Sequence, residues 1–82
     1  MEQRLKLGGI YRHYKGKLYR VEQVVRHSET LEELVFYVTL YENSLGAYWV
    51  RPLPMFLESV LVDGVAVPRF AYVGDVKASA RV

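Results

Sequence analysis

Cysteine is absent from the 82 residues, so neither a disulfide nor a thiolate metal site can supplement the core. No apolar run approaches the roughly 18 residues that cross a bilayer. The start, MEQRLKLGG, lacks the apolar region of a signal peptide. We therefore expect a soluble cytoplasmic protein that makes no membrane contact and whose core holds by side-chain packing alone.

Basic side chains are missing from residues 27–46, which carry four glutamates, whereas residues 1–26 carry seven lysines and arginines. The net charge of +2 is too small to indicate a nucleic-acid binder, so the uneven distribution matters more than the sum. If the two segments pair as neighbouring strands, the charges stabilise the sheet across the strands. Otherwise the basic segment forms a binding face.

Short β-rich runs separated by turn residues fill most of the chain. IYRHYKGKLYRVEQVVRH predicts a hairpin that turns at Lys15-Gly16, and SVLVDGVAVPRF predicts another that turns at Asp63-Gly64. ELVFYVTLYE is the clearest strand, and YWVRP is a short one that Pro52 ends. PLPMFLESV predicts a single helical turn that leads into the next strand.

Alternation along the strands predicts which side chains are buried. In ELVFYVTLYE, we expect the core face to consist of Leu34, Phe36, Val38 and Leu40. The opposite face, with Val35, Tyr37, Thr39 and Tyr41, is then a second packed layer or a ligand surface. In the preceding strand, one face holds Tyr19, Val21, Gln23 and Val25, and the other, mostly solvated, holds Leu18, Arg20, Glu22, Val24 and Arg26.

Five or six short strands with tight connections predict an all-β fold, since closing the sheet protects edges that a flat sheet exposes. The expected architecture is a small, strongly bent antiparallel barrel, SH3-like, with at most a single helical turn. We expect an N-terminal extension over residues 1–8, the β-barrel domain over residues 9–72, and a loosely ordered tail over residues 73–82.

The stretch RHSET places a histidine, a serine and a carboxylate side by side. On an extended strand, His27, Ser28 and Glu29 point alternately to opposite sides, which argues against a catalytic triad. No G-x-S-x-G serine motif and no P-loop accompanies them. Thr30 and Glu33 instead match a capping box, so we interpret HSETLEE as a structured connection between two strands.

Metal binding would require His13 and His27, the two histidines of the chain, to converge with carboxylates. The first predicted hairpin brings their strands near each other without bringing these side chains together. A histidine hydrogen-bonded to backbone at a strand end is the commoner arrangement. We therefore predict neither a metal site nor a cofactor.

Aromatic and basic residues alternate in the first hairpin and gather again near Trp49. Such a set can hold single-stranded nucleic acid, because rings stack on bases and cations meet phosphates. It can equally hold a peptide in a tyrosine-rich groove. Aromatic rings also dominate the interiors of small β domains, and we assign Tyr19 and Trp49 in particular to such a packing role.

Five segments, GIYRHYKGKLYRV, RHSET, LVFYVTLYE, WVRPLPMFLE and VPRF, together resemble a bacterial domain-of-unknown-function family, number sixteen fifty-three. The resemblance covers roughly Gly9 to Phe70. It implies a small, often stand-alone cytoplasmic bacterial domain, and it brings no assigned activity or ligand. The polar residues that match the family's signature, such as His13, Ser28 and Arg69, indicate either a ligand site or a buried hydrogen-bond network.

The leading hypothesis is a non-enzymatic binding module, with single-stranded nucleic acid as its ligand. The alternatives are a peptide or protein interaction domain and, third, a small enzyme that uses His13 or His27 with Glu29 as an acid–base pair. The chain is expected to be a monomer or a homodimer. The hypothesis assigns no catalytic residue, and its ligand-binding residues are Tyr11, His13, Lys15, His27, Glu29, Tyr41, Trp49 and Arg51.

Overall fold

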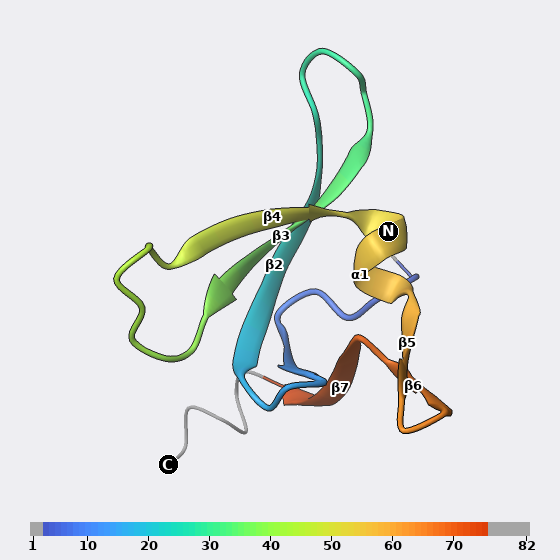
Figure 1. The fold of residues 1–82 in the computed structure, drawn as a ribbon. Helices are drawn as coiled ribbons and strands as arrows, with labels where there is room; N and C mark the ends of the chain where they lie inside the picture. Colours follow the sequence, from blue (N-terminus) through green and yellow to red (C-terminus); the bar gives the residue numbers. More distant parts are fainter. Residues whose placement is uncertain (1–2, 76–82) are drawn as a thin grey trace.

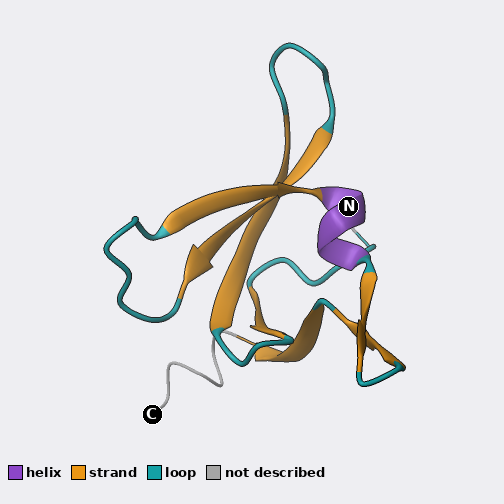
Figure 2. Ribbon diagram, in the orientation of Figure 1, coloured by secondary structure: helices purple, strands orange, loops and turns teal. Residues whose placement is uncertain are grey.

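A computed structural model describes residues 3–75 and shows antiparallel strands with one short helix (Figures 1 and 2). Five strands form one sheet in the order β4-β3-β2-β1-β7, and β5 and β6 form a separate two-stranded sheet. The elements are β1 (Gly9–His13), β2 (Leu18–Arg26), β3 (Glu33–Thr39), β4 (Tyr48–Pro52), α1 (Leu53–Leu57), β5 (Ser59–Val62), β6 (Val65–Pro68) and β7 (Phe70–Asp75).

The all-β prediction is confirmed, with seven strands instead of five or six. The expected closure into a barrel is wrong for the described residues, because β4 and β7 remain the two ends of the large sheet. Pro52 ends β4 and the chain turns into α1, and the following hairpin pairs only with itself. The sheet is therefore bent around its core without being sealed.

Both predicted hairpin turns are confirmed. Gly16 has a φ of 109° and its N–H donates to the His13 carbonyl at 2.7 Å. Asp63 and Gly64 have φ values of 52° and 80°, and such positive values at both central residues are typical of a tight two-residue hairpin turn. The predicted helical turn is confirmed as α1, which begins after Pro52 and buries Leu53 and Phe56.

The predicted core face of β3 is wrong except at Val38, which is buried as expected. Val35 is fully buried and Tyr37 is 5% exposed, whereas Leu34 and Phe36 are only partly buried and Leu40 is exposed. Both faces of this strand carry large apolar residues, so alternation alone could not tell inside from outside. The core cluster consists of Leu5, Tyr11, Val21, Val35, Tyr37, Leu53, Phe56 and Phe70.

A β-bulge in β2 corrects the predicted faces of that strand. Val21 lies opposite Tyr37, but beyond the irregularity Val24 lies opposite Val35, so Glu22 is the extra residue. The bulge shifts the alternation by one position. Val24 therefore packs against the core while Gln23 is exposed, the reverse of the expected arrangement.

The segment before β1, expected as an N-terminal extension over residues 1–8, packs against the core in its described part. Leu5 is part of the core, and the Lys6 N–H donates to the Tyr11 hydroxyl at 2.8 Å. Arg4 forms an ion pair with Glu33 at 2.7 Å, so here the basic and acidic segments do pair. Of the predicted tail, residues 73–75 belong to β7, and residues 76–82 lie outside the described residues.

Over the described part of the chain, no helix is long and apolar enough to cross a membrane.

Candidate functional site

Aromatic rings from separate strands meet at one end of the large sheet. The Tyr19 ring on β2 lies 5.3 Å from the Tyr37 ring and 5.5 Å from the Tyr41 ring, edge to face in both cases. Phe70 lies 5.6 Å from Tyr19 and stacks on Phe56 at 4.1 Å. The buried base of this cluster belongs to the core, and its outer rings form the wall of a pocket.

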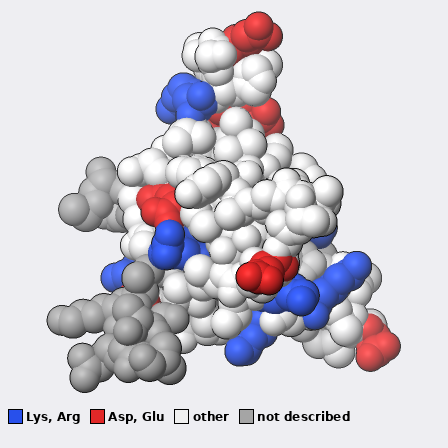
Figure 3. Space-filling model, turned by 90° about the vertical axis from the view of Figure 1, so that its left-hand side faces the viewer, with Lys and Arg blue, Asp and Glu red and all other residues white. Residues whose placement is uncertain are grey.

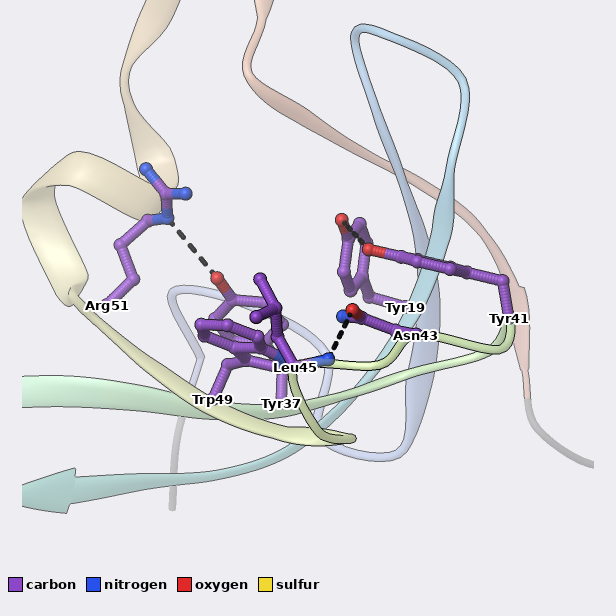
Figure 4. Close-up of a pocket in the computed structure, with 7 residues that line it drawn as sticks. All are labelled: Tyr19, Tyr37, Tyr41, Asn43, Leu45, Trp49 and Arg51. Atoms are coloured by element: carbon purple, nitrogen blue, oxygen red, sulfur yellow. Dashed lines mark hydrogen bonds between the residues drawn. The ribbon is translucent and has the colours of Figure 1, made fainter.

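The pocket has a volume of about 340 Å³ and lies between the sheet and the loop over residues 40–47. β4 contributes Trp49 and Arg51, and Trp49 lies directly opposite Tyr37 in the β3–β4 register. Figure 4 shows Arg51 on one side of the pocket and Tyr19 with Tyr41 on the other. The full lining consists of Tyr19, Tyr37, Tyr41, Asn43, Leu45, Trp49 and Arg51.

Local hydrogen bonds hold the loop against β4. The Asn43 side-chain oxygen accepts from the Leu45 N–H at 3.0 Å, and the Asn43 carbonyl accepts from the Gly46 N–H at 3.2 Å. Gly46 has a φ of 116°, a conformation that favours glycine. The Trp49 indole N–H donates to the Gly46 carbonyl at 3.0 Å, so the loop also orients the indole.

Arg51 is the cation of the pocket. Its Nε lies 3.5 Å from the Tyr37 hydroxyl, and its guanidinium carbon lies 5.4 Å from the centre of the Phe70 ring. Among residues 3–75, no carboxylate forms a salt bridge with it. The Arg51 guanidinium contacts the Phe70 ring and the Tyr37 hydroxyl. Its remaining N–H groups can donate hydrogen bonds to a ligand.

Two tyrosine hydroxyls meet on the opposite wall. The Tyr19 and Tyr41 oxygens are 2.7 Å apart, and burial together with this hydrogen bond raises the pKa of the Tyr19 phenol above its ordinary value. Lys17 lies at the outer side, with its Nζ 4.8 Å from the centre of the Tyr41 ring. The raised pKa keeps the Tyr19 hydroxyl protonated in neutral solution, and the Lys17 ammonium group lies beside this wall.

His13 lies beside the aromatic cluster, outside the pocket lining. Its ring is 4.6 Å from the Tyr14 ring and 5.0 Å from the Phe70 ring. Its Nδ1 accepts from the Lys15 N–H at 3.2 Å. Burial, and then the charges of Arg51, Arg69 and Lys15, lower the pKa of the imidazole below its ordinary value of 6.5, which favours the neutral form.

The sequence-predicted site residues divide into separate groups. Tyr41, Trp49 and Arg51 line the pocket together. His13 ends β1 and Lys15 lies in the turn that follows, whereas Tyr11 is 6% exposed and belongs to the core. The remaining two, His27 and Glu29, lie at the far end of the β2–β3 hairpin.

The far end of that hairpin projects at the top of Figure 1. His27 follows the last residue of β2 and is eight residues beyond Tyr19, roughly 26 Å at about 3.3 Å per residue of extended chain. Its Nδ1 accepts from the backbone N–H groups of Glu29 and Thr30 at 3.1 and 3.3 Å. His27 and Glu29 therefore do not share a cleft with His13 and Arg51.

RHSET forms a tight connection without the predicted capping box. The Thr30 hydroxyl accepts from the Glu32 N–H at 3.2 Å, and Glu33 pairs with Arg4 instead of reaching back. The Leu31 N–H donates to the His27 carbonyl at 2.9 Å, and Leu31 has a φ of 65°. The motif is thus a turn that joins β2 to β3, as the interpretation of a structured connection expects.

Four pocket residues were absent from the predicted site: Tyr19, Tyr37, Asn43 and Leu45. Tyr19 was assigned to packing, and it does pack, yet it also lines the pocket. Tyr37 could have been found from its position opposite Trp49, once the two strands were paired. Asn43 precedes Leu45 and Gly46 in a loop whose hydrogen bonds the sequence alone does not fix.

The sequence matches the family model described as Protein of unknown function (DUF1653) over residues 9–72. A crystal structure described as that of a DUF1653 protein from Bordetella bronchiseptica is similar, with a TM-score of 0.80 and 39% sequence identity. The similarity covers 87% of this chain and 91% of that one. No curated protein matches the sequence. The chain belongs to the DUF1653 family, as the resemblance predicted.

Proposed function

We propose that this protein is a non-enzymatic binding module for single-stranded nucleic acid, and that the tyrosine-lined pocket is its ligand site. One observation carries the proposal: Arg51, which no carboxylate pairs among the described residues, lies in a pocket walled by the rings of three tyrosines and a tryptophan. Aromatic walls accept the flat face of a base, and the guanidinium accepts a partner that carries negative charge or exposed oxygens.

Base stacking supplies the attraction. Trp49 is 36% exposed, so part of its indole remains uncovered, and Tyr41 faces the pocket from the other wall. A base that stacks on an aromatic side chain typically gains about 1–3 kcal/mol. The pocket volume of about 340 Å³ suits one flat ring system with its sugar, so we expect one nucleotide to enter while its neighbours lie along the surface.

Cations at the rim suit the phosphates. Lys17 lies over the Tyr41 ring and Lys15 lies 5.8 Å from the centre of the Tyr14 ring, both beside the aromatic cluster. Figure 3 shows an uncharged area in the centre of one face, with Lys and Arg side chains at its lower right, where Asp or Glu side chains also lie. Ammonium groups of this kind attract a phosphate backbone without regard to its sequence.

The pocket lining favours binding over acid–base catalysis. Among residues 3–75, the lining contains no histidine and no carboxylate, whereas the third hypothesis paired His13 or His27 with Glu29. His13 and Glu29 lie at opposite ends of β2. The Glu29 contact with His27 described above comes from its backbone N–H.

Fluorescence of Trp49, the one tryptophan of the chain, provides the test. We expect a uridine oligonucleotide to change this fluorescence at low salt, and the affinity to fall as salt rises, with a log–log slope of about −0.7 for each neutralised phosphate. Lys17→Gln should weaken binding and make the slope shallower by about 0.7. Arg26→Gln removes one positive charge at the far hairpin end and should leave the slope unchanged.

Two outcomes would contradict the proposal. Oligonucleotides that leave the Trp49 signal unchanged at low salt, in both RNA and DNA form, would show that the pocket takes no base. Tight binding of apolar peptides with no dependence on salt would instead make the protein a peptide interaction domain, since burial of apolar surface is insensitive to ionic screening.

A further inference from the structure

The fixed polar groups of the pocket are donors. The Asn43 side-chain oxygen accepts from the Leu45 N–H, so the NH₂ group is the part of this amide that remains for a ligand. The Arg51 guanidinium can only donate. The Trp49 N–H is engaged by the Gly46 carbonyl. Tyrosine hydroxyls rotate and can either donate or accept, so they adapt to the ligand and do not select it.

We propose that the pocket selects keto bases, namely uracil, thymine and guanine, over cytosine and adenine; this inference rests on the proposed function. Keto bases present a carbonyl oxygen where cytosine and adenine present an exocyclic NH₂ group. The exocyclic NH₂ group of cytosine or adenine is a donor, so it cannot form a hydrogen bond with the NH₂ group of Asn43 or the guanidinium of Arg51. A donor that the bound base covers without offering an acceptor costs more than a hydrogen bond gains, so the amino bases bind less tightly.

The two donors lie on separate segments, so a base can meet both. Asn43 comes from the loop and Arg51 from β4, and the rings of Tyr37 and Trp49 lie between them in the lining (Figure 4). A flat base on these rings therefore has donors on both sides of its edge. No carboxylate in the lining offers an acceptor to an amino group.

Homopolymers that differ only in the base test this selection. We expect the uridine oligonucleotide to bind about ten-fold tighter than the cytidine oligonucleotide of equal length, the factor that one mismatched hydrogen-bonding group typically gives. Inosine carries a carbonyl where adenosine carries NH₂, so an inosine oligonucleotide should likewise bind more tightly than an adenosine one. Both comparisons use the unaltered protein with Trp49 fluorescence as the signal.

Asn43→Asp tests the residue assigned to selection. Aspartate keeps an oxygen that can accept from the Leu45 N–H, so the loop is retained, but it replaces the donor group with an acceptor. We expect all affinities to fall because of the added negative charge, and the uridine-to-cytidine ratio to fall by about ten-fold. Ser44→Ala changes an exposed neighbour outside the lining and should preserve the ratio.

The results separate the two proposals. Equal affinities for uridine and cytidine oligonucleotides, or an Asn43→Asp protein with an unchanged ratio, would overturn the selection and leave nucleic-acid binding in place. Binding of none of the oligonucleotides would overturn the proposed function, and the selection with it. Displacement of bound uridine oligonucleotide by a peptide that carries a carboxylate would show instead that the donors recognise any anionic oxygen pair, and would also overturn base selection.

Discussion

His13 packs against the rings of Tyr14 and Phe70 and lies near enough to the cations Arg51, Arg69 and Lys15 to feel their charge. Burial and these cations all lower the pKa of its imidazole. A protonated His13 would add a further positive charge to a cluster of cations. The pKa of His13 is therefore sensitive to the positive charges beside the pocket.

Stability should depend on the charge of His13. Because its pKa is lower in the folded chain than the 6.5 of the unfolded chain, the unfolded state binds more protons between those two values. The contribution is fully present above about pH 6.5 and is lost as the pH falls through the folded pKa. Urea unfolding of the unaltered protein should show this loss on acidification, and His13→Gln should reduce it.

His27→Gln is the matched control, since it removes the other histidine at the far turn. The unaltered protein and the His27→Gln variant should lose stability in parallel as the pH falls. A His13→Gln protein with the same pH dependence as the unaltered one would show that its neighbours do not act on the imidazole as described.

At the level of elements, the bulge at Glu22 decides which later side chains of β2 pack against the core, and the orientation of β3 brings Tyr37 to the pocket. The hairpins and the helical turn could be predicted because Gly16, Gly64 and Pro52 have strong local preferences. The orientation of β3 could not, since Leu34 and Phe36 are as apolar as Val35. Which face of β3 is buried is determined by the packing of the whole domain and not by local residue preferences.

Close approach of β1 to its neighbours gives a prediction for Gly9. A Cβ atom at this position would lie 2.8 Å from the Tyr72 ring and 3.1 Å from the Lys6 carbonyl oxygen. We expect Gly9→Ala to lower the free energy of unfolding by about 1–3 kcal/mol, the usual cost of overpacking. Urea unfolding measures the change.

A double-mutant cycle identifies the contact responsible. In a Tyr72→Leu background, the added cost of Gly9→Ala should fall, because the ring that meets the new methyl group is gone. An equal cost in both backgrounds would place the strain on the Lys6 backbone instead.

Across the whole molecule, the predicted site residues lie at opposite ends of the large sheet, with the pocket residues at one end and His27 and Glu29 at the other. Aromatic and basic interleaving correctly indicated Tyr41, Trp49 and Arg51 as neighbours, because β3 and β4 pair directly. The same interleaving could not show where His27 and Glu29 lie. In the structure, the length of β2 separates these two residues from Tyr19. The proposed ligand site therefore lies at one end of the sheet alone.

Backbone chemical shifts of the ¹⁵N-labelled protein, followed by NMR as a uridine oligonucleotide is added, test that assignment most directly. We expect the largest changes at the Trp49 indole N–H and at the amides of residues 41–51, with a smaller change at Tyr19. The amides of residues 27–32 should stay where they are. Largest changes at residues 27–32 or in the β5–β6 hairpin, or no changes anywhere at low salt, would contradict a nucleic-acid site in the tyrosine-lined pocket.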